Sequence, residues 1–284
     1  MSAAPDDHDG ERAVPEKQPG RLARVSAGWK AVSGAVATIA TAVGVLTTLG
    51  LVGGGGGGPG PSDAMAAAAS KTATAGSSTL QVSITRTPRG AAAADTIVGR
   101  GEIDYRGGRG RMEWDLSNSP GLEDLGEVEV LFNGPVLYVP AAVLGLPKDK
   151  PWVRVAFADL DRIDSTSQYA VLSDLKIDDP TQVVKSLDEN SSGAKKVGEE
   201  QAFGVKTTHY RAQRDPDGKG PATPTTVDLL VDEAGYMRRV ETLSHGASGT
   251  VKTVTLLDEF GVAVDARPPP SRRAVDFGRL LRGT

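Results

Sequence analysis

The segment STLQVSITR, residues 78–86, decides the fold class, because apolar and polar side chains alternate along it without a break. Leu80, Val82 and Ile84 occupy every second position, and polar residues stand between them. Successive side chains of a strand point to opposite faces of the sheet. The period of two therefore predicts a strand with one apolar face and one solvated face.

The same alternation recurs at hairpin spacing along the rest of the chain. Turns rich in glycine at Gly107–Gly110, in FNGP (132–135) and in DEAG (232–235) separate neighbouring runs, which is typical of antiparallel strands. Further strands are expected at 96–108, 109–117, 126–134, 135–140, 150–160, 194–204, 205–215, 225–235, 236–246 and 250–261.

Helical patterns occur in two places, 62–78 and about 165–190. The first is rich in alanine, and Ser62 or Asp63 would cap it. Within the second, Asp179 would cap a helix that has proline at its first position. Apolar stripes are formed by Tyr169, Leu172 and Leu175 and, in the capped helix, by Val183, Val184 and Leu187.

Strands without helical crossovers predict an α+β protein with one antiparallel sheet of about ten or eleven strands. So large a sheet must curl, and its apolar face must be covered. The two helical segments are the expected lid, and their thin stripes leave room for an apolar cavity. An ordinary filled core explains the same pattern equally well. The residues expected to line a cavity are Val82, Ile84, Ile103, Tyr105, Met112, Trp114, Val130, Phe132, Leu172, Leu175, Val183, Val184 and Leu187.

Residues 31–52 contain no charged side chain. A helix of this length is about 33 Å long, enough to span a hydrocarbon core of about 30 Å. Basic residues precede the segment and Asp63 is the first charge after it, which predicts a cytoplasmic N-terminus and an extracytoplasmic main domain. A cleaved export signal and a buried soluble helix are the alternatives. The residues expected to contact the membrane in this anchor are Trp29, Ile39, Val43, Leu46 and Leu49.

The composition argues against several chemistries. Cysteine is absent, and the formal net charge is −4, so thiolate sites are excluded and nucleic-acid binding is not expected. His209 and His245 lack the spacing of metal ligands. We expect no metal, no cofactor and no catalytic residue, with His209 as a structural residue of a strand. Arg238 and Arg239 are interpreted as flanking a turn, with lipid headgroups as the alternative partner.

Three segments carry a resemblance to a known family. They are DDPTQVVKSLDENSSGAKKVGEEQAFGVKTTHYRAQRD (178–215), TTVDLLVDEAGYMRRVETL (225–243) and LLDEFGVAVDARPPP (256–270). In content and order they resemble the actinobacterial LolA-like lipoproteins of the LppX/LprG type. The resemblance implies a curved antiparallel half-barrel sheet with helices across its mouth. It also implies an apolar cavity for the acyl chains of lipids or lipoproteins.

One feature departs from that family. Glycine stands after residue 52 where those lipoproteins carry the cysteine that receives a lipid, so the apolar segment itself would hold the protein at the cell membrane. We expect a lipid carrier of the cell envelope whose partners are the membrane and a lipid or acylated ligand. An envelope-stress sensor or regulator, with an envelope protein as partner, and a structural envelope protein with a filled core are the alternatives.

These expectations divide the chain into five parts. They are a disordered cytoplasmic tail (1–30), a transmembrane anchor (31–52), a glycine-rich linker (53–63), a LolA-like extracytoplasmic domain (64–276) and a basic tail (277–284).

Overall fold

The computed structural model describes residues 60–90, 94–119, 122–146, 151–160, 162–163, 172, 175, 179–185, 191–214, 225–246 and 249–282. These residues belong to one compact unit, Gly56–Thr284. The predicted anchor at 31–52 lies outside the described residues, as do Tyr169 and Leu187. Within the ranges given above, no helix is both long and apolar enough to cross a membrane. The anchor and its residues Trp29, Ile39, Val43, Leu46 and Leu49 therefore stay a prediction.

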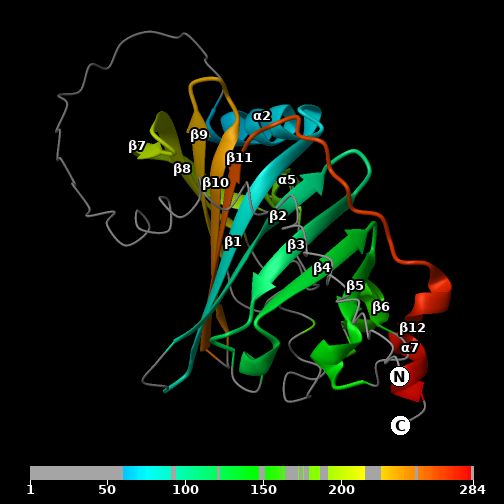
Figure 1. The fold of residues 1–284 in the computed structure, drawn as a ribbon. Coiled ribbons are helices and arrows are strands. Elements are labelled where there is room, and N and C mark those ends of the chain that lie inside the picture. The colour runs from blue at the N-terminus through cyan, green and yellow to red at the C-terminus, as the bar shows by residue number, and fades with distance from the viewer. Residues whose placement is uncertain are drawn as a thin grey trace, which may run out of the picture. The chain divides into compact units, whose positions relative to one another are not determined.

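A single sheet of 12 strands dominates the described part of the chain (Figure 1). Its order is β12-β6-β5-β4-β3-β2-β1-β11-β10-β9-β8-β7. The strands are β1 (Ser77–Pro88), β2 (Asp95–Asp104), β3 (Arg109–Asp115), β4 (Glu127–Asn133), β5 (Val136–Pro140), β6 (Trp152–Ala156), β7 (Ser191–Ala202), β8 (Val205–Arg214), β9 (Thr225–Asp232), β10 (Met237–Gly246), β11 (Gly249–Asp258) and β12 (Ala274–Asp276). All eleven expected strands are present.

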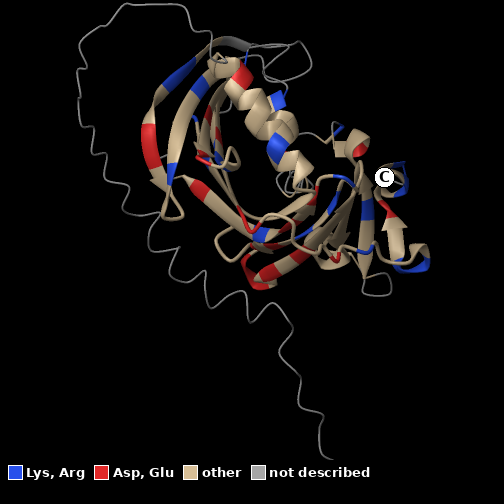
Figure 2. Ribbon diagram, turned by 90° about the horizontal axis from the view of Figure 1, so that it is seen from above, with Lys and Arg blue, Asp and Glu red and all other residues tan. Residues whose placement is uncertain are grey.

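The sheet consists of two antiparallel meanders joined in the middle. One runs from β1 to β6 and the other from β7 to β11, and the pairing of β1 with β11 connects them. The two ends of the strand order are not paired with each other, so the sheet is open. Seen from above, the sheet curves, and helix α2 (Pro61–Thr74) lies within the curve (Figure 2). The predicted curved antiparallel sheet with few helices is confirmed.

The C-terminal segment differs from the expectation of a basic tail. β12 lies parallel to β6, with Val275 opposite Val153, and it is followed by helix α7 (Phe277–Arg282). Phe277 is fully buried. A strand of three residues is too short to show an alternating pattern. The basic side chains that surround Phe277 in the sequence favoured an exposed tail, although Phe277 itself is buried in the core.

The register confirms that one face of the sheet is apolar. Leu80 and Val82 of β1 lie opposite Gly101 and Gly99 of β2, and Gly99 lies opposite Trp114 of β3. Residues paired in this way point to the same face. The apolar rows continue through Val128 and Val130 of β4, Leu137 and Val139 of β5, and Val153 and Val155 of β6.

Helix α2 (Pro61–Thr74) is the first element that the structure describes. It begins earlier than expected, since Gly60 is its N-cap and Pro61 its first residue. The carboxylate of Asp63 accepts a hydrogen bond of 3.0 Å from the Gly60 backbone N–H. Asp63 therefore stabilises the start of the helix from its third position, and neither Ser62 nor Asp63 is the cap.

Short helices complete the cover of the sheet. Helix α5 (Pro180–Lys185) begins as predicted, because the Asp179 carboxylate accepts hydrogen bonds from the Thr181 backbone N–H at 2.8 Å and the Thr181 hydroxyl at 2.7 Å. α2 packs against α5 and against β7, β9 and β10. The other short elements are α3 (Phe157–Leu160) and the 3-10 helices η3 (Glu123–Leu125), η4 (Ala141–Leu144) and η5 (Ser271–Arg273).

Candidate functional site

The candidate site is the inner face of the sheet, where buried apolar side chains form two clusters. The β1–β6 cluster contains Leu80, Val82, Ile84, Ile97, Ile103, Met112, Trp114, Leu116, Val128, Val130, Phe132, Leu137, Val139, Ala141, Val143, Val153, Val155, Leu160, Leu172, Leu175 and Phe277. The β8–β11 cluster contains Met65, Ala68, Ala69, Val184, Ala212, Val227, Leu229, Val231, Met237, Val240 and Leu257. They meet where Leu80 of the first lies opposite Leu257 of the second.

Most of the residues predicted to line a cavity are in the β1–β6 cluster. They are Val82, Ile84, Ile103, Met112, Trp114, Val130, Phe132, Leu172 and Leu175. Val184 lies instead in the β8–β11 cluster, and half-buried Val183 packs against that cluster. Tyr105 packs against both. Leu187 lies outside the described residues. The residues that were predicted to line a single cavity thus belong to two neighbouring clusters.

Sequence reasoning missed much of the β8–β11 cluster. Val227, Leu229 and Val231 stand at alternate positions of β9, and all three are buried. The alternation predicts a strand, but it does not indicate which of its two faces is buried. Met65 lies in an alanine-rich helix with little apolar surface, so only the structure shows that it is almost fully buried.

The inner face also carries threonine between the two clusters. Thr255 and Thr253 of β11 lie opposite Val82 and Ile84 of β1, and Thr242 of β10 continues the second row. Thr255 is buried. The apolar surface therefore covers both halves of the sheet but is interrupted by hydroxyl groups along β11.

Tyr105 lies at the junction of the two clusters. Its hydroxyl and that of Ser78 are joined by a hydrogen bond of 2.6 Å. Burial raises the pKa of Tyr105 above its ordinary value, the bond to Ser78 opposes this, and the nearby charge of Asp179 adds to it. The phenol is therefore neutral at physiological pH, and its hydrogen bond to Ser78 joins the end of β2 to β1.

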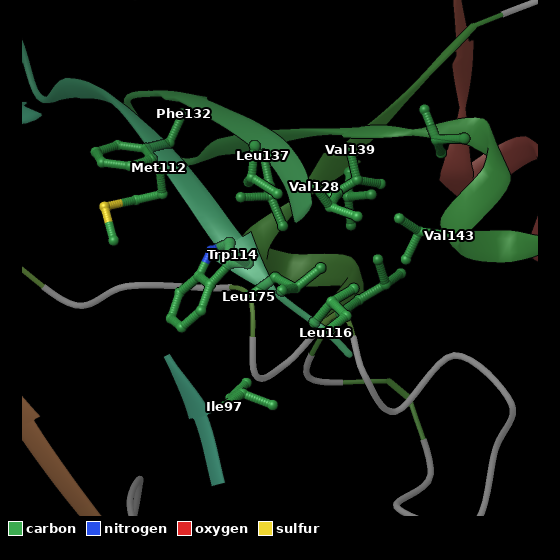
Figure 3. Packing of buried hydrophobic residues seen from close by; sticks show 14 of the residues in the cluster. Ile97, Met112, Trp114, Leu116, Val128, Phe132, Leu137, Val139, Val143 and Leu175 are labelled. Carbon is green, nitrogen blue, oxygen red and sulfur yellow. The ribbon is translucent and has the colours of Figure 1, made fainter. Parts of the chain in front are cut away.

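Trp114 lies in the middle of the β1–β6 cluster, among Met112, Leu175 and Leu116 (Figure 3). The indole lies across β2, because a Cβ added to Gly99 would stand 2.6 Å from its Cε3 atom. Trp114 is fully buried, and its Nε1 atom has no hydrogen-bond partner among the described residues. The same is true of the Ser119 hydroxyl oxygen, five positions further on.

Leu172 and Leu175 supply part of the cover above these strands. Both are helical and fully buried in the β1–β6 cluster. Their spacing of three residues places them on one side of a helix, as the sequence predicted. Of the stripe predicted for α5, Val184 is buried and Val183 half-buried, and Leu187 lies outside the described residues.

The outer face of the second meander carries a charged network centred on His209. Its Nε2 atom lies 2.5 Å from the Asp228 carboxylate and its Nδ1 atom 2.7 Å from the Glu200 carboxylate. The hydrogen bond to Asp228 is the main cause that raises the pKa of His209, and Glu200 adds to it against the effect of burial. Arg211 donates a hydrogen bond of 2.7 Å to the same Asp228 carboxylate. His209 thus links β7, β8 and β9, which is a structural role.

Arg238 and Arg239 find carboxylate partners within the protein. Arg238 lies 2.7 Å from Asp232 and 2.6 Å from Asp258, and Arg239 pairs with Glu241. These contacts support the interpretation that both arginines flank the β9–β10 turn. No group of three or more His, Cys, Asp or Glu side chains in the described ranges is arranged to hold a metal ion.

Comparison with known proteins gives distant relatives. No model of a known protein family matches the chain. A Streptomyces coelicolor protein described as "Putative lipoprotein" is 26% identical over 130 residues, which cover 46% of this chain and 44% of that protein. An uncharacterized 31.2 kDa protein of Streptomyces griseus is 25% identical over 154 residues, which cover 47% of this chain and 50% of that one. The chain thus matches about half the length of these curated relatives.

Matches among solved structures come from several bacteria. The lipoprotein LppX of Mycobacterium tuberculosis matches with a TM-score of 0.44 and 13% identity, over 72% of this chain and 98% of that one. LprF of Mycobacterium bovis matches with a TM-score of 0.44 and 13% identity, over 76% and 99%. A LolA superfamily protein of Nitrosomonas europaea matches with a TM-score of 0.26 and 11% identity, over 72% and 96%.

Proposed function

We propose that this chain, which is similar to the LolA-like lipoproteins of the LppX/LprG type, binds the acyl chains of lipids or lipoproteins on the inner face of its open sheet. One observation carries the proposal: that face is apolar over both meanders, and short segments cover it. α2, with 14 residues, is the longest helix among those that the structure describes.

Apolar burial supplies the affinity. Each CH₂ group moved from water to an apolar surface is worth about 0.8 kcal/mol. An acyl chain of a dozen or more carbons therefore brings on the order of 10 kcal/mol before the entropy costs of binding. No ionic contact is needed for this, and the proposal includes no catalytic step and no cofactor.

The cell envelope is the proposed location. The apolar segment 31–52 would hold the chain at the membrane, and the glycine-rich linker would let the sheet reach the bilayer surface. The name of the Streptomyces coelicolor relative also supports an envelope role. In this proposal the protein carries acyl chains between the membrane and another acceptor.

Lipid that copurifies with the protein tests the proposal. The full chain is purified, extracted with organic solvent and analysed by mass spectrometry. We expect acylated lipid close to stoichiometric amount. Leu172→Gln places a polar group at a fully buried cover residue and should lower the amount severalfold. Val98→Gln changes a residue that is 37% exposed and that points to the outer face of β2, next to inward-facing Ile97, and it should leave the amount unchanged. Equal, trace amounts of lipid in all three proteins would refute the proposal.

A further inference from the structure

Two buried polar atoms of the β1–β6 half lack a hydrogen-bond partner among the described residues, the Nε1 atom of Trp114 and the hydroxyl oxygen of Ser119. Trp114 is fully buried and Ser119 is 6% exposed. Buried polar groups in folded proteins nearly always have a partner, and leaving one without a partner is costly. An indole N–H kept in the middle of an apolar cluster therefore calls for an explanation.

The sheet fixes the indole by one edge. A Cβ at Gly99 would stand 2.6 Å from Cε3 and 2.7 Å from Cδ2 of Trp114, so this edge of the ring lies over β2. Nε1 belongs to the opposite edge of an indole. The surrounding side chains of the cluster, among them Met112, Leu116 and Leu175, are apolar. The N–H group is thus held in place, and these neighbours offer it no oxygen acceptor.

The chemistry of the donor restricts what it can bind. An indole N–H donates one hydrogen bond and accepts none. A carboxylate would be costly to bury in an apolar cluster without a positive partner. A neutral carbonyl oxygen can accept the bond and remain in apolar surroundings. Esters and amides of acyl chains carry such an oxygen next to a long hydrocarbon chain.

We propose that the Trp114 Nε1–H group donates a hydrogen bond to the ester or amide carbonyl of a bound acyl ligand. The inference rests on the proposed function and narrows it. The preferred ligands are acyl esters or amides, in place of alkyl ethers or free fatty acids. Trp114 is then a specificity-determining residue, and the apolar clusters supply affinity without regard to the linkage.

A matched pair of ligands tests the inference on the full chain. Monopalmitoylglycerol and hexadecylglycerol have the same chain length and headgroup, but only the first has a carbonyl. Each displaces a fluorescent acyl probe in competition. Wild type should bind the ester about five- to tenfold more tightly than the ether, the value of one hydrogen bond. Trp114→Phe should reduce this ratio to about one and leave the ether affinity within about twofold. Trp152→Phe, which changes a residue of β6 outside both clusters, should keep the wild-type ratio.

A spectroscopic measurement makes the test independent of how Trp114→Phe folds. The chain has three tryptophans, so isotope labelling of tryptophan gives three indole N–H resonances. Trp29→Phe and Trp152→Phe identify two of them, and the third belongs to Trp114. The ester should move the Trp114 resonance downfield, and the ether should not.

The outcomes separate this inference from the function on which it rests. Equal binding of ester and ether by wild type, or an unchanged ratio in Trp114→Phe, would overturn the role of Trp114 and leave acyl binding intact. Failure of both ligands to displace the probe would overturn both proposals.

Discussion

Gly99 lies opposite Trp114 in the pairing of β2 with β3, and its missing side chain makes room for the indole ring. Gly110 does the same for Phe132 of β4. Neither glycine has the positive φ angle that favours glycine in turns. Both therefore serve packing, and large side chains from the next strand fill the surface that they leave open.

Gly99→Ala should destabilise the protein, because the new Cβ would stand 2.6 Å from the Trp114 ring and 3.0 Å from the Met112 methyl group. Overpacking of this kind costs about 1–3 kcal/mol. Urea denaturation of the full chain measures the free energy of unfolding. Gly198→Ala is the control, since nothing lies within 4 Å of its added Cβ, and it should change stability by less than about 0.5 kcal/mol. An equal effect of both substitutions would contradict this account of Gly99.

The sequence revealed these residues only in part. Ile103, Met112 and Trp114 were assigned correctly to one face, because alternation alone determines which side chains share a face. The role of the glycines could not be predicted, since it depends on which strand lies next to β2 and in which register. The unpaired Nε1 of Trp114 is likewise a property of the folded cluster.

His209 should make stability depend on pH. Its pKa is raised above the ordinary value of 6.5 by Asp228 and Glu200, so folding favours the protonated form. This contribution is fully present below about pH 6.5 and is lost as the pH rises through the raised value. The free energy of unfolding, measured from pH 5.5 to about 9, should fall over this window in wild type. The fall should be smaller in His209→Gln.

His245→Gln is the control for that measurement, because His245 lies at the exposed end of β10. It should retain the pH profile of wild type. A profile of His209→Gln that coincides with the wild-type profile would show that the ion pairs with Asp228 and Glu200 do not contribute to folding.

At the scale of elements, α2 is attached to the sheet by a hydrogen bond as well as by packing. The Thr72 hydroxyl accepts a buried hydrogen bond of 3.0 Å from the Met237 backbone N–H. Next to it, Lys71 donates to the Ala234 carbonyl and lies 5.0 Å from the Tyr236 ring centroid. The C-terminal end of α2 is thus fixed to the start of β10.

Thr72→Val should weaken this attachment. The substitution keeps the shape of the side chain and leaves the buried Met237 N–H group without its acceptor, a cost of about 1–3 kcal/mol. Thr74→Val is the control, because in the described part of the chain the Thr74 hydroxyl donates its hydrogen bond to the Ser70 carbonyl of its own helix, at the surface. Thermal denaturation should show a lower midpoint for Thr72→Val than for Thr74→Val. Equal midpoints would mean that packing alone holds α2.

The elements themselves were largely predictable from the sequence. Eleven strands and the Asp179 cap of α5 follow from alternation and from capping chemistry, both of which act locally. The start of α2 was misplaced, because Pro61 at the first helical position makes Gly60 the cap. β12 was missed because its pairing with β6 joins residues far apart in the sequence.

At the scale of the molecule, the sheet unites two meanders whose apolar faces form two clusters. The open antiparallel sheet was predicted, and one relative of the chain is described as a lipoprotein, which agrees with the expected resemblance to lipoproteins. The division of the core was not predictable. It depends on the threonines of β11, which meet Val82 and Ile84 only once β1 and β11 pair.

The central claim is that an acyl chain binds on the inner face of this sheet through apolar burial. A competition series of monoacylglycerols that differ by two carbons, measured on the full chain, tests it most directly. Affinity should rise about fourfold for each added CH₂ group, which corresponds to about 0.8 kcal/mol per group, until the longest chain that fits. Affinity that does not change with chain length, or no binding at any length, would contradict the claim.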